Sequence, residues 1–544
     1  MKSTDDRSGD VKMRNYRLTG VVSIVLMLAG CSVAAVLQGK GHCTEKHNSY
    51  AEPLEAAPSE QDALAHIGED FIVDERFCSH LPIVILDTNG IEPPINTYED
   101  HEQKRFVAIE GLDPYVEGTI SVISGEDGVN TLQDTPQLVS SMRIKRRGNS
   151  SMLYEKAQWM VKLVTESGQD NDVDVLGMGE EHEWILNGSM FDKSLLRNYL
   201  AYSIASEFMS YTPDSRFCEV LIREGTQYRY QGVYLLGESI KQGPDRVDIA
   251  EYKKGEVFNS YLVRRDRYEE NVNILETYGQ KNGYSTEFFE LLYPTRRRAE
   301  EDMIQYAQKD LNAIEKVIYS DDPEIFATYP DVIDVDSFVD YFLLNEFFAS
   351  YDSGNFSTYC YKDVGGKLTM GPVWDFDGTM DNYRNEALET GVLAFQTKPW
   401  FDRLCKDKNF VKKLEKRYIR LRQTTLFEKH VTEKIDEITA HLGGAQERDW
   451  YRWGHWYTTE NKYSLLPEKN KQGEVKIRNA VNYPDEIYRI KTVLREHGRQ
   501  LPEAIKGLEK LTDKDTGAEN WMGWLLLLAA CVFFIPAAVV SLRK

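Results

Sequence analysis

The stretch 345–379 carries two groups of side chains that could hold a divalent metal. Asp352 and Asn355 form the first group, and Asp375 and Asp377 form the second. Carboxylate and amide oxygens are the ligands that Mg²⁺ and Mn²⁺ prefer, whereas zinc sites favour histidine and cysteine. The sequence therefore predicts a site for Mg²⁺ or Mn²⁺, provided that the two groups meet in the fold.

A predicted hairpin brings the two groups together. Residues 355–362 and 367–374 are rich in β-branched and aromatic residues, and residues 363–366 between them have the composition of a turn. Pairing about this turn sets residue 355 opposite residue 374, so the first group is expected to meet the second. Asp-Ser-Gly-Asn and Asp-Gly are also common turn sequences, which is the alternative interpretation of either group alone.

A basic and polar segment upstream could bind phosphate groups. It consists of Arg147, Gly148, Asn149, Ser150 and Ser151, and it offers backbone N–H groups and hydroxyls to an anion. Lys162 and Lys156 are alternative candidates for a lysine that pairs with nucleotide phosphates. An ordinary hairpin turn and solvated lysines are the competing interpretations. Phosphoryl transfer needs such a clamp, one or two metal ions and a carboxylate that orients the attacking hydroxyl.

Composition and motif searches exclude several classes of function. The formal net charge of -22 and the sequence pI near 5.1 make nucleic acid an unsuitable partner. Seven cysteines occur without Cys-x-x-Cys spacing, which argues against a zinc ribbon. The ten histidines show no His-Glu-x-x-His spacing, and no Gly-x-Ser-x-Gly sequence is present, which argues against a zinc hydrolase and an α/β-hydrolase.

Both ends of the chain are apolar and flanked by basic residues. Residues 1–37 contain the uncharged run 18–37, which is interpreted either as an uncleaved anchor or as a lipoprotein signal cut before Cys31. Residues 521–542 are predicted to form a transmembrane helix that ends before Arg543-Lys544. The basic flanks place both termini in the cytoplasm. The protein is therefore predicted to reside in the cell membrane, with its main domain outside the cell.

Between these ends, strands come first and helices later. Residues 38–77 are polar and read as a linker, residues 78–250 alternate as short strands, and residues 251–510 carry most of the helical pattern. This layout, with acidic residues on a hairpin between the two parts, predicts a two-lobed, atypical protein-kinase-like α+β fold. Its N-lobe is an antiparallel sheet and its C-lobe is mainly helical, with membrane segments at both termini.

Taken in order, these segments resemble the CotH kinase family, the atypical protein kinases similar to spore coat protein H. The resemblance is carried by Leu81-Pro82, Arg147–Ser151 with Lys162, Asp192–Asn198, Gly232–Glu238, Arg246-Val-Asp248, Asn345-Glu346, Asp352, Asn355, Gly371-Pro-Val-Trp-Asp-Phe-Asp377 and Pro399-Trp-Phe401. It covers residues 78–505 approximately, and the block that ends at Asp377 is its most specific part.

The resemblance implies an ATP-dependent kinase that phosphorylates Ser or Thr of surface or secreted proteins. Asp352 would orient the substrate hydroxyl, and Asp375 and Asn355 would bind the metal, with Asp377 as a further metal or structural partner. Lys162 would pair with ATP phosphates, and Glu238 would lie near the adenine. The family also contains surface adhesins, so the alternative is a binding or adhesion protein with little or no transfer activity on the same fold.

Overall fold

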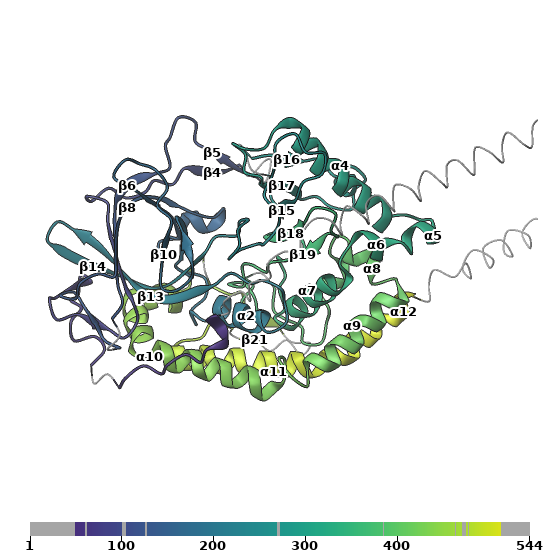
Figure 1. The fold of residues 1–544 in the computed structure, drawn as a ribbon. Helices are drawn as coiled ribbons and strands as arrows, with labels where there is room; N and C mark the ends of the chain where they lie inside the picture. The colour runs from purple at the N-terminus through teal and green to yellow at the C-terminus, as the bar shows by residue number, and fades with distance from the viewer. Residues whose placement is uncertain are drawn as a thin grey trace, which may run out of the picture.

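The computed structural model describes residues 49–59, 62–100, 105–125, 128–268, 272–384, 386–462, 464–469, 475–476 and 478–512. Figure 1 shows a strand-rich part beside a mixed part, with long helices running along one side of both.

Seven strands in the first half close into a barrel. Around the ring they follow the order β14 (Gln227–Glu238), β12 (Glu183–Asn187), β9 (Trp159–Val164), β8 (Leu138–Arg146), β6 (Val116–Ile123), β3 (Ile83–Asp87) and β13 (Ser215–Glu224). The ring closes because β13 pairs with β14 on one side and with β3 on the other. The pairing of β3 with β13 is parallel, and the other pairings in the ring are antiparallel.

Alternation along these strands fills the barrel with apolar side chains. In β9, Trp159, Val161 and Leu163 are buried, whereas Met160 and Lys162 between them point outward and are partly exposed. The outward-facing side chains of β9 are therefore available to a site on the barrel wall. Short strands flank the barrel: β1 (Ile72–Val73) pairs with β14, and the two-stranded pairs are β2 (Cys78–Ser79) with β7 (Asn130–Thr131), β4 (Thr97–Asp100) with β5 (Arg105–Ala108), and β10 (Val173–Asp174) with β11 (Glu180–Glu181).

A second, five-stranded sheet lies beside the barrel. Its order is β16 (Ile274–Leu275), β17 (Phe288–Tyr293), β15 (Tyr261–Asp266), β18 (Thr358–Lys362) and β19 (Thr369–Met370). Helix α7 (Val335–Phe347) delivers the chain to β18. It is buried on nearly every side, and Asp334 caps it by accepting the N–H groups of Asp336 and Ser337. The sheet and this helix thus position the segment 348–357 between them.

The remaining helices cover both sheets. They are α2 (Arg197–Ser206), α3 (Tyr278–Lys281), α4 (Glu301–Ile318), α5 (Pro323–Phe326), α6 (Tyr329–Val332), α8 (Phe401–Leu404), α9 (Lys408–Leu421), α10 (Glu428–Thr458), α11 (Tyr483–Gly507) and α12 (Glu509–Thr512). Short 3-10 turns occur at Ser49–Ala51, Ser150–Leu153 and Phe395–Thr397. A last pair of short strands joins β20 (Glu468–Lys469) to β21 (Val475–Lys476). The aromatic segment 450–457 forms the end of α10. This helix kinks at Gly443, where an added Cβ would lie 2.3 Å from Ala57 Cβ.

The predicted hairpin is present but shorter than the sequence suggests. Cys360 pairs with Met370, one residue away from the predicted register, in which residue 360 faces residue 369. The Gly366 N–H closes the predicted turn on the Asp363 carbonyl at 2.9 Å. The second strand is short because Leu368 pairs with residues before α7 instead, donating its N–H to the Val332 carbonyl at 3.0 Å.

The prediction of a two-lobed kinase-like fold with terminal membrane segments was wrong. The strands of the first half close into a barrel with one parallel pairing, and the region predicted as mainly helical carries a five-stranded sheet. Strand patterns reveal where strands lie but not which distant strands pair, and the closure depends on such a distant pair. The predicted segments 18–37 and 521–542 lie outside the described residues. Among the described residues, no helix is both long and apolar enough to cross a membrane.

Candidate active site

A cleft of about 960 Å³ lies between the outer wall of the barrel and the five-stranded sheet. The barrel contributes outward-facing residues of β9 and β12, among them Met160 and Ile185, together with the loop after β8. The opposite wall includes Tyr359 of β18 and Leu292 of β17. A volume of this size is typical of sites for nucleotide-sized ligands.

Three predicted carboxylates meet in this cleft. Asp352, Asp375 and Asp377 all line it, and the Ser357 hydroxyl donates to Asp375 Oδ2 at 3.2 Å. Asn198 of α2 holds the second group in place, because its Nδ2 donates to Asp377 and its Oδ1 accepts the Phe376 N–H at 2.7 Å. Carboxylates before β18 and after β19 therefore lie in one site, as the predicted hairpin requires.

The carboxylates of the cleft resist ionisation together. Burial raises the pKa of Asp352. The pKa of Asp375 is raised to about 6, mainly by desolvation and secondly by repulsion from Asp352. The Asp375 side chain nevertheless remains accessible to solvent within the cleft. Burial and then the charge of Asp375 raise the pKa of Asp377. A divalent cation would relieve this repulsion, and carboxylates are ligands that suit such an ion. Among the described residues, however, these three side chains do not bring one ligand atom each within 4.8 Å of the others.

The candidate phosphate loop faces the carboxylates. Gly148, Asn149, Ser150 and Ser151 all line the same cleft. The Arg147 guanidinium lies 5.0 Å from the centre of the Trp374 ring, next to Asp375 in sequence. The loop has left-handed backbone at Gly148, whose φ is +99°. Basic and polar groups thus line the same cleft as the acidic cluster.

Gly148→Ala is expected to raise the dissociation constant of a nucleoside triphosphate about tenfold in a calorimetric titration. An added Cβ would lie 1.9 Å from Ser151 Oγ, so the Ser151 hydroxyl must turn away while the backbone bears the strain of a positive φ. Gly168→Ala is the matched control, because its φ is +78° and nothing lies within 4 Å of the added Cβ. Equal dissociation constants for the two variants would contradict a role for the 148–151 loop in binding phosphates.

The two candidate lysines occupy different environments. Lys162 is partly exposed and pairs at 2.9 Å with Glu183, which lines the cleft, although Lys162 itself is not among the lining residues. Lys156 is fully buried and donates to Asp449 Oδ1 of α10 at 2.6 Å. Lys156 therefore joins the segment after the phosphate loop to α10, while Lys162 stands at the edge of the cleft.

The structure places two other predicted residues outside the lining of the cleft. Glu238, at the end of β14, is bonded to Arg246 and accepts the Tyr211 hydroxyl at 2.7 Å, and it lines a separate cavity of about 390 Å³. Asn355 lies in the turn that begins at Asp352, where its N–H donates to the Asp352 carbonyl at 3.1 Å. The roles of both residues stay predictions.

The sequence model of the CotH kinase protein family matches residues 144–499, well over half of the chain. The chain belongs to the CotH kinase family. No curated protein matches it. Family membership indicates a kinase, and kinases in general use ATP and a divalent metal. In this CotH kinase family member, the match begins within β8 and ends within α11, so it includes the 148–151 loop and the three carboxylates.

Two basic residues beside Asp352 have no local signature in the sequence. The charges of Arg267 and Lys398 both favour ionised Asp352, against the effect of burial on its pKa. The Arg267 guanidinium lies 3.7 Å from the centre of the Phe356 ring, and Lys398 Nζ donates to the Tyr351 carbonyl. Arg267 follows β15 and Lys398 follows a 3-10 turn, so only tertiary packing brings them to the site.

Three arginines hold the chain that follows Asp377. Arg197 Nε donates to the Thr379 carbonyl at 3.0 Å, and its other nitrogens bond Asp192 and Glu486. Arg478 donates to the Asp381 and Tyr383 carbonyls at 2.8 Å, and Arg489 donates to the Asp381 carbonyl at 2.7 Å. These contacts to backbone oxygens fix the loop that carries the acidic cluster, and their long sequence separation explains why the sequence does not reveal them.

Glu346 is expected to make folding stability depend on pH. Its buried carboxyl accepts the N–H groups of Ala394 and Phe395, and burial raises its pKa to about 8 from 4.5. Because the folded protein holds this proton more tightly than the unfolded chain, the stability that Glu346 contributes is lost as the pH rises from about 4.5 to about 8. Glu346→Gln lacks this loss.

Urea unfolding at about pH 5 and about pH 8 measures the effect. From the lower to the higher pH, the free energy of unfolding of Glu346→Gln should rise relative to that of wild type by at least about 1 kcal/mol. One pKa unit corresponds to about 1.4 kcal/mol. The exposed Glu324→Gln serves as a control. A difference that is the same at both pH values would contradict the prediction.

Proposed function

We propose that this protein transfers the γ-phosphoryl group of ATP to a Ser or Thr hydroxyl of a protein substrate. The observation that carries the proposal is that Asp352, Asp375 and Asp377 line one cleft together with the 148–151 loop. A clamp for phosphates, oxygen ligands for a cation and a carboxylate for the hydroxyl are the parts that this chemistry needs. Membership in the CotH kinase family supports the same conclusion.

Asp375 and Asp377 would hold Mg²⁺ or Mn²⁺, together with Asn355 if its side chain turns into the cleft. Bound there, the ion would neutralise charge on the phosphates. Asn198 and Ser357 orient the two carboxylates through the hydrogen bonds described above. The loop 148–151 would place N–H and hydroxyl donors on the phosphates, with Arg147 adjacent.

Asp352 would act as the general base. The substrate oxygen forms a bond to the γ-phosphorus, the bond from that phosphorus to the bridging oxygen breaks, ADP leaves, and the hydroxyl proton passes to Asp352. Burial raises the pKa of Asp352 and so strengthens it as a base, while Arg267 and Lys398 keep it ionised and ready to accept a proton. These opposed effects suit a group that must be charged before the reaction and protonated after it.

Metal-dependent ATP binding tests the proposal. Calorimetric titration of the full-length protein with ATP should show saturable binding that requires Mg²⁺ or Mn²⁺ and disappears on chelation. Asp375→Ala should lose the metal-dependent binding of ATP, whereas Asp321→Ala should keep it, because Asp321 is 96% exposed. A wild-type protein that binds no ATP with either metal would overturn the proposal and favour the adhesion protein instead.

The location of the domain outside the cell stays a proposal as well. It rests on the charge pattern of terminal segments that lie outside the described residues. Mass spectrometry of the mature N-terminus would show whether the chain begins at Met1 or at a lipidated Cys31.

A further inference from the structure

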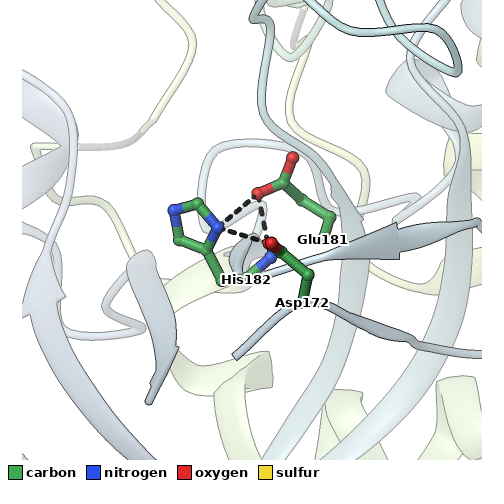
Figure 2. A group of neighbouring side chains, drawn as sticks. All are labelled: Asp172, Glu181 and His182. Atoms are coloured by element: carbon green, nitrogen blue, oxygen red, sulfur yellow. Dashed lines mark hydrogen bonds and ion pairs between the residues drawn. The ribbon is translucent and has the colours of Figure 1, made fainter. Parts of the chain in front are cut away.

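Away from the cleft, His182 is surrounded by carboxylates at the β10–β11 hairpin (Figure 2). Its Nδ1 lies 2.6 Å from Asp172 Oδ1 and 3.0 Å from Glu181 Oε1, and its Nε2 lies 3.7 Å from Asp170 Oδ2. The imidazole is only 19% exposed. One ligand atom each from Asp172, Glu181 and His182 lies within 4.8 Å of the others. Figure 2 shows both carboxylates pointing toward the same ring nitrogen.

The fold fixes this arrangement before any ligand arrives. Val173 pairs with Glu181 in the hairpin, and the same register places Asp172 opposite His182. Both arms are tied to β9, because the Leu163 N–H donates to the His182 carbonyl at 2.7 Å and the Asn171 N–H donates to the Leu163 carbonyl at 3.1 Å. The three side chains therefore converge from paired backbone and not from a mobile loop.

We propose that Asp172, Glu181 and His182 bind a divalent transition-metal ion of the Zn²⁺ or Mn²⁺ kind. Metal–ligand bonds of about 2.0–2.2 Å require ligand atoms about 3.0–3.4 Å apart in tetrahedral or octahedral geometry. The two distances from Nδ1 differ from this range by at most a few tenths of an ångström. An imidazole with two carboxylates suits these ions better than Mg²⁺, which prefers oxygen ligands alone.

Asp170 supplies a second reason for this assignment. When Nδ1 binds a metal, the ring proton must lie on Nε2, and Asp170 faces that nitrogen from the other side of the ring. A carboxylate in this position orients the imidazole and strengthens it as a ligand in many metal sites. Glu181 Oε1 already accepts the His182 N–H at 2.8 Å, the Glu183 N–H at 3.2 Å and a bond from Lys241 Nζ at 2.8 Å. Glu181 would therefore bind the ion through its second oxygen or release one of these donors.

The site is distinct from the proposed catalytic metal but connected to the cleft. His182 is followed directly by Glu183, which lines the cleft and pairs with Lys162. An ion bound at His182 would fix the start of β12 and with it the position of the Glu183 carboxylate. The assignment rests on the hairpin alone and does not require that the protein be a kinase.

Zn²⁺ titration of the full-length protein, with Mg²⁺ in excess to occupy the acidic cluster of the cleft, tests the proposal. Wild type should bind one Zn²⁺ saturably. His182→Gln should weaken this binding at least about 100-fold, and Asp170→Asn should weaken it about tenfold, as expected for loss of an orienting partner. Asp375→Ala should bind Zn²⁺ as wild type does.

Two matched controls separate this site from a general effect of charge. His66→Gln removes another histidine that contacts a carboxylate, Asp74, at 3.2 Å, and Asp174→Asn removes an acidic side chain from the same hairpin. Neither should change the Zn²⁺ affinity by more than about twofold. The proposal is overturned if wild type binds no Zn²⁺ under these conditions, or if folded His182→Gln, verified by its thermal unfolding, binds it as tightly as wild type.

Discussion

Asp352→Asn is expected to lower kcat for phosphoryl transfer about 10²–10⁴-fold, the usual contribution of a general base. The amide keeps the shape of the carboxylate but cannot accept the hydroxyl proton. ATP affinity should remain within a few-fold of wild type, because Asp352 is assigned to the substrate hydroxyl and not to the metal. Steady-state kinetics together with ATP titration would separate the two effects.

Asp321→Asn and Asp375→Asn are the two controls for Asp352→Asn. The exposed Asp321→Asn should behave as wild type. Asp375→Asn should lose both metal-dependent ATP binding and transfer, since it removes a proposed metal ligand. If Asp352→Asn retained the kcat of wild type, the assignment of Asp352 as the base would be wrong even if the protein proved to be a kinase.

Lys156→Met is expected to destabilise the protein by about 3–5 kcal/mol, the range found when one partner of a buried ion pair is removed. Lys156 and Asp449 are both 0% exposed. The substitution would leave the Asp449 carboxylate buried, with the Val233 N–H at 2.8 Å and the Tyr457 hydroxyl at 3.0 Å as its remaining donors among the described residues. Urea unfolding of variant and wild type would measure the change.

An exposed ion pair of similar length is the control for this prediction. Lys281 and Glu276 lie 2.9 Å apart with side chains 53% and 66% exposed, so Lys281→Met should cost less than about 1 kcal/mol. The double variant Lys156→Met/Asp449→Asn should recover part of the loss, because no uncompensated charge remains buried. Equal destabilisation by Lys156→Met and Lys281→Met would show that the Lys156 contact to α10 is not a structural ion pair.

The acidic cluster could be anticipated because its signals are local. The turn at 363–366 and the two strand-forming runs beside it predict a hairpin, and the hairpin brings Asp352 near Asp375 even though the register differs by one residue. Side-chain type then limits the ligand to a hard cation. Each of these steps uses residues that are close together in the sequence.

The barrel and the supports of the site depend on contacts between distant segments. Parallel pairing of Val84 with Val220 closes the ring, and an alternating strand pattern does not identify such a partner. Lys156 and Lys162 could not be told apart for the same reason, since Asp449 lies far along the chain. The site at His182 could not be predicted from the sequence, because the carboxylates around this histidine converge only through the hairpin register.

Transfer of the γ-phosphoryl group by this cleft is tested most directly with two labelled donors, γ-labelled ATP and α-labelled ATP. Each is incubated with the full-length protein, a substrate protein that contains Ser and Thr, and Mg²⁺ or Mn²⁺. We expect label on Ser or Thr from γ-labelled ATP only, and we expect this label to be lost in Asp375→Ala and on chelation of the metal. Label from α-labelled ATP would indicate nucleotidyl transfer, and no label from either donor would indicate no transfer. Either result would contradict the conclusion that this cleft catalyses γ-phosphoryl transfer.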